Sequence, residues 1–65
     1  MKCIINDRKK IVKKIKFNGK ISDLLLKLGI NPEVIILKRN GVLVTEIDSV
    51  KDRDVLEIMR VIYGG

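Results

Sequence analysis

Two glycines, Gly64 and Gly65, close the sequence directly after an apolar, strand-like run over residues 54–63. Glycine has no Cβ, so these two residues can pass a narrow channel and adopt backbone conformations that other residues avoid. A terminal carboxyl group with a pKa of about 3.5 is ionised at neutral pH. We interpret this unhindered carboxylate as the reacting group of the chain. The alternative is an unstructured terminus, or a remnant of cloning, without a chemical role.

The remaining residues offer little catalytic chemistry. The sequence has no histidine and one cysteine, Cys3, so it contains no zinc-type cluster and no intramolecular disulfide. It has no candidate catalytic triad and no phosphate-binding loop. Cys3 lies on the face of a predicted strand that points toward the core, and it is expected to be an inert small hydrophobe. We therefore expect a protein that is not an enzyme, with no metal site and no cofactor of its own.

The length of 65 residues predicts a single domain over residues 1–65, and 46% hydrophobic residues make a small core possible. No 18-residue apolar stretch is present, so we expect no transmembrane helix. The opening residues 1–6 lack the long apolar core and cleavage site of a signal peptide. A cytoplasmic, reducing location is therefore the default expectation, and we expect no membrane partner.

The net charge of +6 is concentrated in the first half of the chain. Residues 1–28 hold nine Lys or Arg and two acids, whereas residues 29–65 hold five and six. This basic half is either a solvated surface or a patch that attracts an acidic protein or a nucleic acid. Phe17 and Tyr63 are the only aromatic residues and are too few for a base-stacking platform, which disfavours a nucleic-acid partner. A basic nucleic-acid-binding module that uses the hairpin over residues 8–20 remains an alternative of a different class.

Apolar periodicity defines the elements that must position the tail. Ile21, Leu24, Leu25 and Leu28 follow helical spacing and predict a helix over residues 21–28, with Ser22 or Asp23 capping its first turn and Gly29 at its end. The helix is too short to persist alone and must lie on a sheet. Alternating or continuous apolar runs predict strands over residues 1–6, 10–17, 33–39, 42–44 and 54–62.

Turn chemistry and strand phase complete the prediction. Asn40-Gly41 favours a type I′ hairpin turn, and Lys13 breaks the phase of the second strand, which indicates a bulge or a frayed edge. A connecting loop is expected over residues 45–53. In the last strand, Leu56 and Ile58 share one face. The opposite face is expected to hold Val55, Glu57, Met59 and Val61.

The element order, the Asn40-Gly41 hairpin, the turn over residues 51–54 and the Gly-Gly end together resemble the ubiquitin-like sulfur carriers of the ThiS/MoaD type, including the archaeal small modifier proteins. The resemblance covers the whole chain and is most specific over residues 52–65. It implies an α+β fold of the β-grasp type, a mixed sheet of about five strands with one main helix on one face. It also implies a flexible tail over about residues 62–65. Arg53 stands where the family often has glycine, and Tyr63 stands where small residues are usual.

The resemblance implies the chemistry and the partners. An E1-like adenylating enzyme, which supplies ATP and Mg²⁺, would convert Gly65 to an acyl-adenylate. A sulfur donor would turn this into a thiocarboxylate for thiamine, molybdopterin or tRNA thiolation. The alternative outcome is conjugation of Gly65 to target lysines.

An adaptable thioether such as Met59 on an exposed strand face is typical of a binding surface. In the family, an apolar residue at the position of Met59 packs on a partner subunit. The expected partner-binding residues are Met59, Arg60, Val61, Ile62, Tyr63, Ile35 and Leu37, and the free chain is expected to be a monomer. The pathway, the cognate enzyme and the acceptor remain open.

Overall fold

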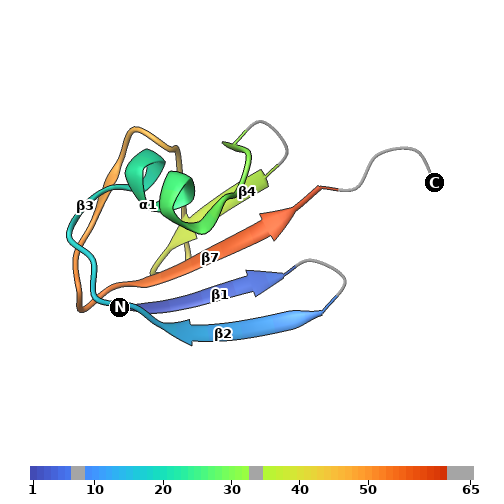
Figure 1. Cartoon of the computed structure of the whole chain (residues 1–65), viewed down its shortest axis with the longest axis horizontal. Coiled ribbons are helices and arrows are strands. Elements are labelled where there is room, and N and C mark those ends of the chain that lie inside the picture. Colours follow the sequence, from blue (N-terminus) through green and yellow to red (C-terminus); the bar gives the residue numbers. More distant parts are fainter. Residues whose placement is uncertain (7–8, 33–34, 62–65) are drawn as a thin grey trace.

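The computed structural model describes residues 1–6, 9–32 and 35–61. Over these ranges the chain forms one α-helix and two sheets (Figure 1). In chain order the elements are β1 (Lys2–Asn6), β2 (Lys10–Lys14), β3 (Gly19–Lys20), α1 (Ile21–Leu28), β4 (Ile35–Arg39), β5 (Val42–Val44), β6 (Ser49–Val50) and β7 (Val55–Arg60). Within the described ranges, no helix has the length and apolar character that a membrane crossing requires.

The main sheet has five strands in the order β2-β1-β7-β4-β5. The two central neighbours β1 and β7 are parallel, and the other pairs are antiparallel. A second, two-stranded sheet joins β3 to β6. This mixed sheet with α1 on one face is the β-grasp arrangement, and the predicted fold class is confirmed.

The core lies between α1 and the main sheet. The predicted helical stripe contributes Ile21, Leu24 and Leu25, each no more than 1% exposed. Beneath them lie buried side chains from three strands of the main sheet and from β6: Cys3, Leu37, Leu56, Ile58 and Val50. Because an isolated eight-residue helix is unstable in water, this apolar contact is what holds α1 in place.

The two ends of α1 are stabilised differently. The helix begins without a side-chain cap, so the predicted capping by Ser22 or Asp23 is wrong. Instead, the first amides donate to the loop after β5: Ile21 N–H to the Asp48 carbonyl and Ser22 N–H to the Glu46 carbonyl, both at 2.9 Å. At the other end, Gly29 has φ 70° and closes the helix as predicted.

The first hairpin differs from its prediction in length. β2 ends at Lys14, although the main-chain bonds between Met1 and Ile15 continue the pairing by one step. Lys13 pairs with Cys3 in an unbroken register, so it marks an edge strand and no bulge forms. All five β2 residues are exposed, as expected for a lysine-rich strand at the edge of a sheet.

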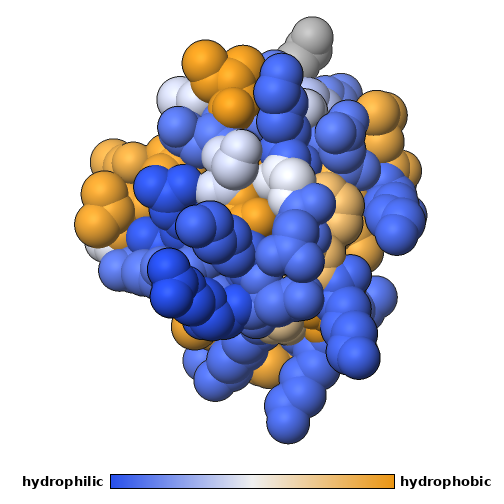
Figure 2. All heavy atoms as spheres, turned by 90° about the vertical axis from the view of Figure 1, so that its left-hand side faces the viewer, coloured by the Kyte–Doolittle hydropathy of each residue, from blue (hydrophilic) through white to orange (hydrophobic). Residues whose placement is uncertain are grey.

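The turns that precede β5 and β7 differ in the backbone conformations that their residues adopt. Asn40 and Gly41 both have positive φ, 51° and 82°, which confirms the two-residue turn. Arg53 does not have positive φ, so arginine fits there without the backbone strain that a glycine position implies. The predicted loop over residues 45–53 contains β6, a strand that the sequence analysis did not identify. Figure 2 looks onto the end of the molecule that holds these turns and shows a surface dominated by hydrophilic side chains.

Candidate functional site

The predicted reacting residues Gly64 and Gly65 lie outside the described residues, as do Ile62 and Tyr63. The structure does describe the element that leads to them. β7 is a central strand of six residues, five of which pair with β4 on one side and five with β1 on the other, and it ends at Arg60. The segment after Val61 therefore starts from one of the best-supported strands of the sheet.

Strict alternation along β7 separates the core from the outward-facing side of the sheet. Leu56 and Ile58 point toward α1 and are 0% and 1% exposed, as predicted. Glu57 and Met59 lie on the opposite side, which we call the open face, and both are half-buried. The prediction that Met59 faces away from the core is confirmed.

The register defines the surroundings of Met59. Its direct neighbours are Asn6 on β1 and Ile36 on β4. Ile36 is 42% exposed, and Leu43 on β5, diagonal to Ile36, is 67% exposed. We call Ile36, Leu43 and Met59 the apolar patch. Ile36 and Leu43 also line a hollow of about 490 Å³ with Pro32 and Val44, so the patch continues into a depression at the sheet edge.

Two predicted members of this surface lie on the other side of the sheet. Leu37 is directly opposite Ile58 and is only 5% exposed, so it belongs to the core. Ile35 is two residues before Leu37 on β4, so it lies on the same face of the sheet, and it packs against the periphery of the core. The prediction that Ile35 and Leu37 extend the exposed surface around Met59 is therefore wrong. The antiparallel register assigns that place to Ile36, which the sequence analysis missed together with Leu43.

Arg60 and Val61 end the described part of the chain after Met59. Arg60 is exposed and lies opposite Ile35, so its strand position belongs to the α1 side of the sheet. Val61 is half-buried and follows the last residue of β7. Met59 and Arg60 therefore occupy opposite faces of the same strand end.

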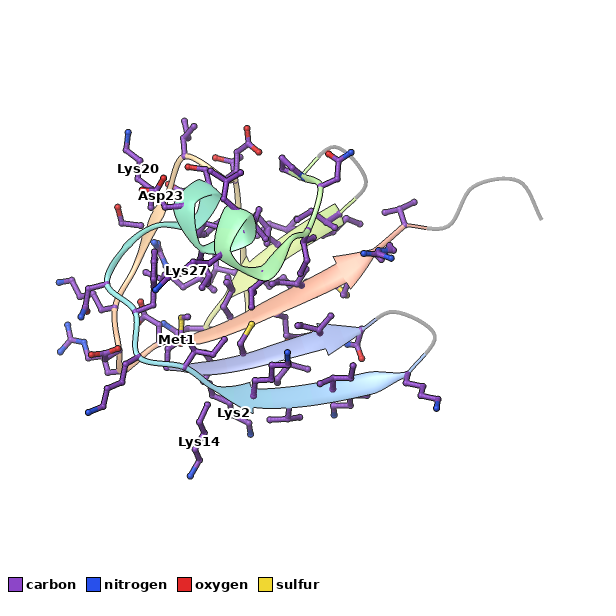
Figure 3. The ribbon with its side chains drawn as sticks, viewed as in Figure 1. Met1, Lys2, Lys14, Lys20, Asp23 and Lys27 are labelled. Carbon is purple, nitrogen blue, oxygen red and sulfur yellow. The ribbon has the colours of Figure 1, made fainter. Side chains whose placement is uncertain are left out.

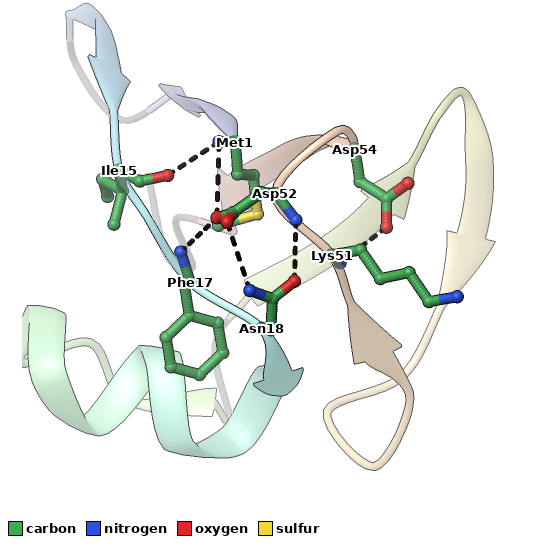
Figure 4. A network of polar contacts seen from close by, with 7 residues as sticks. All are labelled: Met1, Ile15, Phe17, Asn18, Lys51, Asp52 and Asp54. Carbon is green, nitrogen blue, oxygen red and sulfur yellow. Dashed lines mark hydrogen bonds and ion pairs between the residues drawn. The ribbon is translucent and has the colours of Figure 1, made fainter.

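At the opposite end of β7, Asp52 connects three segments (Figure 4). Its carboxylate accepts the Phe17 N–H at 2.6 Å and the Asn18 side-chain amide at 3.1 Å, and lies 4.0 Å from the Met1 ammonium group. The Asp52 N–H donates in return to the Asn18 side-chain oxygen. The Phe17 N–H is the main reason that the pKa of Asp52 lies below its ordinary value.

Asp54 closes the neighbouring turn in a similar way. Its carboxylate accepts the Lys51 N–H at 2.8 Å and the Asn40 side-chain amide at 3.1 Å. The Lys51 N–H is the largest cause of a lowered pKa for Asp54. Asn40 also accepts the Val55 N–H, which ties the β4–β5 hairpin to the start of β7. The acids of the turn over residues 51–54 thus have a structural role in placing β7.

The described body presents few reactive groups. Cys3 is 0% exposed, and burial raises the pKa of its thiol, which keeps it in the unreactive protonated form. Among residues 1–6, 9–32 and 35–61, no three His, Cys, Asp or Glu side chains come together as metal ligands. The arrangement that remains is a supported strand end with an apolar patch beside it.

Comparison with known proteins finds a family and a relative that each match nearly the whole chain. Residues 5–65 match the ThiS family. The chain is also 36% identical over 59 residues to a protein of Thermus thermophilus named sulfur carrier protein TtuB. That alignment covers 91% of this chain and 88% of the relative.

Proposed function

The chain belongs to the ThiS family of sulfur carrier proteins, and from this premise we propose that Gly65 is the residue that carries the sulfur. A sulfur carrier of this family is a protein cosubstrate and not an enzyme, and it works with an activating enzyme and with sulfur-transfer partners. The observation that supports our assignment is the position of β7. This central strand runs directly into the segment that contains Gly64 and Gly65.

The first proposed step activates the terminal carboxylate. A carboxylate is a poor electrophile because charge and resonance repel a nucleophile, but it can itself attack phosphorus. One oxygen of Gly65 attacks the α-phosphate of ATP on the activating enzyme, and pyrophosphate leaves with the electron pair of the broken P–O bond. The product is a Gly65 acyl-adenylate. The activating enzyme supplies the ATP, the Mg²⁺ and the catalytic groups.

The second proposed step installs sulfur. A persulfide on the donor enzyme attacks the acyl carbon, and AMP leaves. A thiol of the donor then cleaves the S–S bond, which leaves a thiocarboxylate on Gly65 and a disulfide on the donor. The carrier thereby holds one sulfur atom in a form that an acceptor enzyme can use as a nucleophile. Thiamine, molybdopterin and thiolated tRNA are the candidate destinations.

Glycine at both terminal positions suits this chemistry for steric reasons. If residues 62–65 are extended, they reach roughly 13–14 Å beyond the strand. That reach allows the folded body to dock outside an active site while the carboxylate enters it. A side chain at position 64 or 65 would widen the segment and restrict its conformations.

The apolar patch is our proposed docking surface for the activating or acceptor enzyme. Ile36 and Leu43 are 42% and 67% exposed, and Met59 lies beside Ile36 on the strand that leads to the tail. Burial of such side chains contributes binding energy in proportion to the apolar area removed from water. Arg60 and Val61, together with Ile62 and Tyr63, are proposed to contact the mouth of the partner's active site.

Intact-mass spectrometry of the native protein, purified from its source without reducing agents, tests the proposal. A thiocarboxylate adds the mass difference between one sulfur and one oxygen atom, and fragmentation should place that difference on Gly65. A protein modifier would instead appear as branched peptides in which Gly65 is joined to a lysine of another protein. Finding only such branches, and no sulfur-loaded form, would replace the carrier assignment by the modifier assignment.

A further inference from the structure

A cationic groove lies at the end of the sheet where β1 and β7 begin, at the opposite end of β7 from Arg60. It has a volume of about 490 Å³ and is lined by Met1, Lys2, Lys14, Ile15, Lys16, Asp52, Arg53, Asp54 and Val55. Four of these residues carry a positive side chain, and all four are exposed: Lys2, Lys14, Lys16 and Arg53. We propose that this groove is a binding site for phosphate groups of a polyanionic ligand. We call it the phosphate groove.

The two acids in the lining offset only part of the charge of the four cations: Lys16 interacts electrostatically with Asp52, and Arg53 with Asp54. Asp52 is held by the Phe17 N–H and the Asn18 side chain, and Asp54 by the Lys51 N–H and Asn40. Within the described ranges, the ion pair from Asp52 is to the Met1 ammonium group, and none within 4.0 Å joins the four cationic side chains to an acid. The four cationic side chains outnumber the two carboxylates, so the lining of the groove keeps a surplus of positive charge.

Lys2 and Lys14 strengthen this argument because they face each other directly. They are cross-strand partners in the β1–β2 register, and Figure 3 shows both side chains pointing away from α1. The main-chain bonds between Met1 and Ile15 make the next pair, Lys2 and Lys14, a non-hydrogen-bonded pair, in which side chains lie closest. Like charges at such positions repel each other, and a bound anion would relieve that repulsion.

The chemistry of the lining favours phosphate. Lysine ammonium groups act as mobile point charges on phosphate oxygens, and the Arg53 guanidinium can hold two oxygens of one phosphate. No aromatic side chain among the described residues lines the groove, so the site has no platform there for stacking a base. We therefore expect contacts to the charged backbone or phosphate chain of the ligand and little dependence on base sequence.

The location of the groove makes it independent of the tail chemistry. β7 begins at Val55, in the groove lining, and ends at Arg60. A strand of this length spans about 17 Å, so a ligand in the phosphate groove leaves the apolar patch and the strand end accessible. The carrier could then contact a phosphate-bearing ligand at one end while the other end is docked on an enzyme.

The test is an NMR titration of the ¹⁵N-labelled full chain at low salt with three probes: sodium tripolyphosphate, a single-stranded RNA dodecamer and a dodecamer of glutamate. We expect tripolyphosphate or RNA to shift the amides of Lys2, Lys14, Lys16 and Arg53, while amides of the apolar patch stay in place. Binding of RNA alone identifies a phosphodiester ligand, and equal binding of tripolyphosphate identifies a free phosphate chain. Equally tight binding of the glutamate peptide would overturn the proposal in favour of an acidic protein surface.

Matched charge variants complete the test. Lys2→Gln combined with Lys14→Gln should weaken phosphate binding by about tenfold or more, because each removes a charge-assisted contact. Lys10→Gln combined with Lys20→Gln removes the same charge from exposed positions outside the lining and should change affinity less than about twofold. Equal losses in the two double variants would show diffuse charge attraction and overturn the site. Gly65 adenylation should be unchanged in both, which separates this result from the proposed function.

Discussion

Ile36 and Met59 lie directly opposite each other on β4 and β7, on the open face of the sheet. Leu37, which follows Ile36, and Ile58, which precedes Met59, form the next pair and point into the core beneath α1. The same two strands thus provide both a buried face and a partly exposed apolar face. This relationship decides which substitutions should affect partner binding and which should affect folding.

Met59→Asp should weaken binding to the activating enzyme by about tenfold or more, because it places a charge directly beside Ile36 in the apolar patch. Val12→Asp is the matched control: Val12 is 51% exposed on edge strand β2, on the same face but away from the patch. Calorimetric titration of both variants with the purified enzyme measures the difference. Equal affinities for the two variants would remove the patch from the docking surface.

Leu37→Ala should destabilise the fold by about 2–5 kcal/mol, because it leaves a cavity opposite Ile58. Ile36→Ala changes the neighbouring residue on the exposed face and should cost about 1 kcal/mol or less. Urea denaturation of the two variants measures both free energies of unfolding. Similar costs for the two would contradict the register between β4 and β7.

Acid should destabilise the protein through Asp52 and Asp54. Hydrogen bonds lower the pKa of both carboxyls in the folded state, whereas an unfolded Asp titrates near about 3.9. Their stabilisation is therefore complete above about pH 4 and is lost as pH falls through the lower native pKa values. Asp52→Asn keeps an acceptor oxygen but cannot titrate, so its melting temperature should fall less steeply between about pH 4 and 2. Identical pH profiles for wild type and variant would show that Asp52 does not contribute.

Gly29→Ala should destabilise the protein by about 1 kcal/mol, because Gly29 ends α1 with φ 70° and an added Cβ meets no atom within 4 Å. The cost is then purely conformational. Gly29→Asn should recover part of it, since asparagine tolerates the left-handed region better than alanine. Thermal denaturation followed by circular dichroism gives the comparison. Equal melting temperatures for Gly29→Ala and wild type would contradict the left-handed conformation.

The sequence predicted the elements whose apolar residues follow one regular spacing or whose turn residues are distinctive. The bounds of α1 follow from Ile21, Leu24 and Leu25 at helical spacing and from Gly29 at the end. The β4–β5 hairpin follows from Asn40-Gly41, because few residue pairs accept positive φ at both positions. The alternation of Ile58 and Met59 follows from period two along β7.

The errors fall where local pattern is ambiguous or absent. The run over residues 34–37 is apolar at every position. Its sequence therefore shows no alternation of apolar and polar residues that could decide whether Ile36 or Leu37 faces α1. Only the pairing with β7 settles this. β3 and β6 have two residues each and are too short to show a period. The amides at the start of α1 are satisfied by carbonyl groups of a distant loop, which no local capping signal reveals.

The central claim is that Gly65 is the activated residue, and ATP–pyrophosphate exchange with the cognate activating enzyme tests it most directly. A chain with one alanine added after Gly65 has the same body, the same apolar patch and the same charge. We predict that this extended chain folds normally, binds the enzyme and supports no exchange above background. Exchange at the wild-type rate would contradict the account, because the reacting carboxylate would then not need to be that of Gly65.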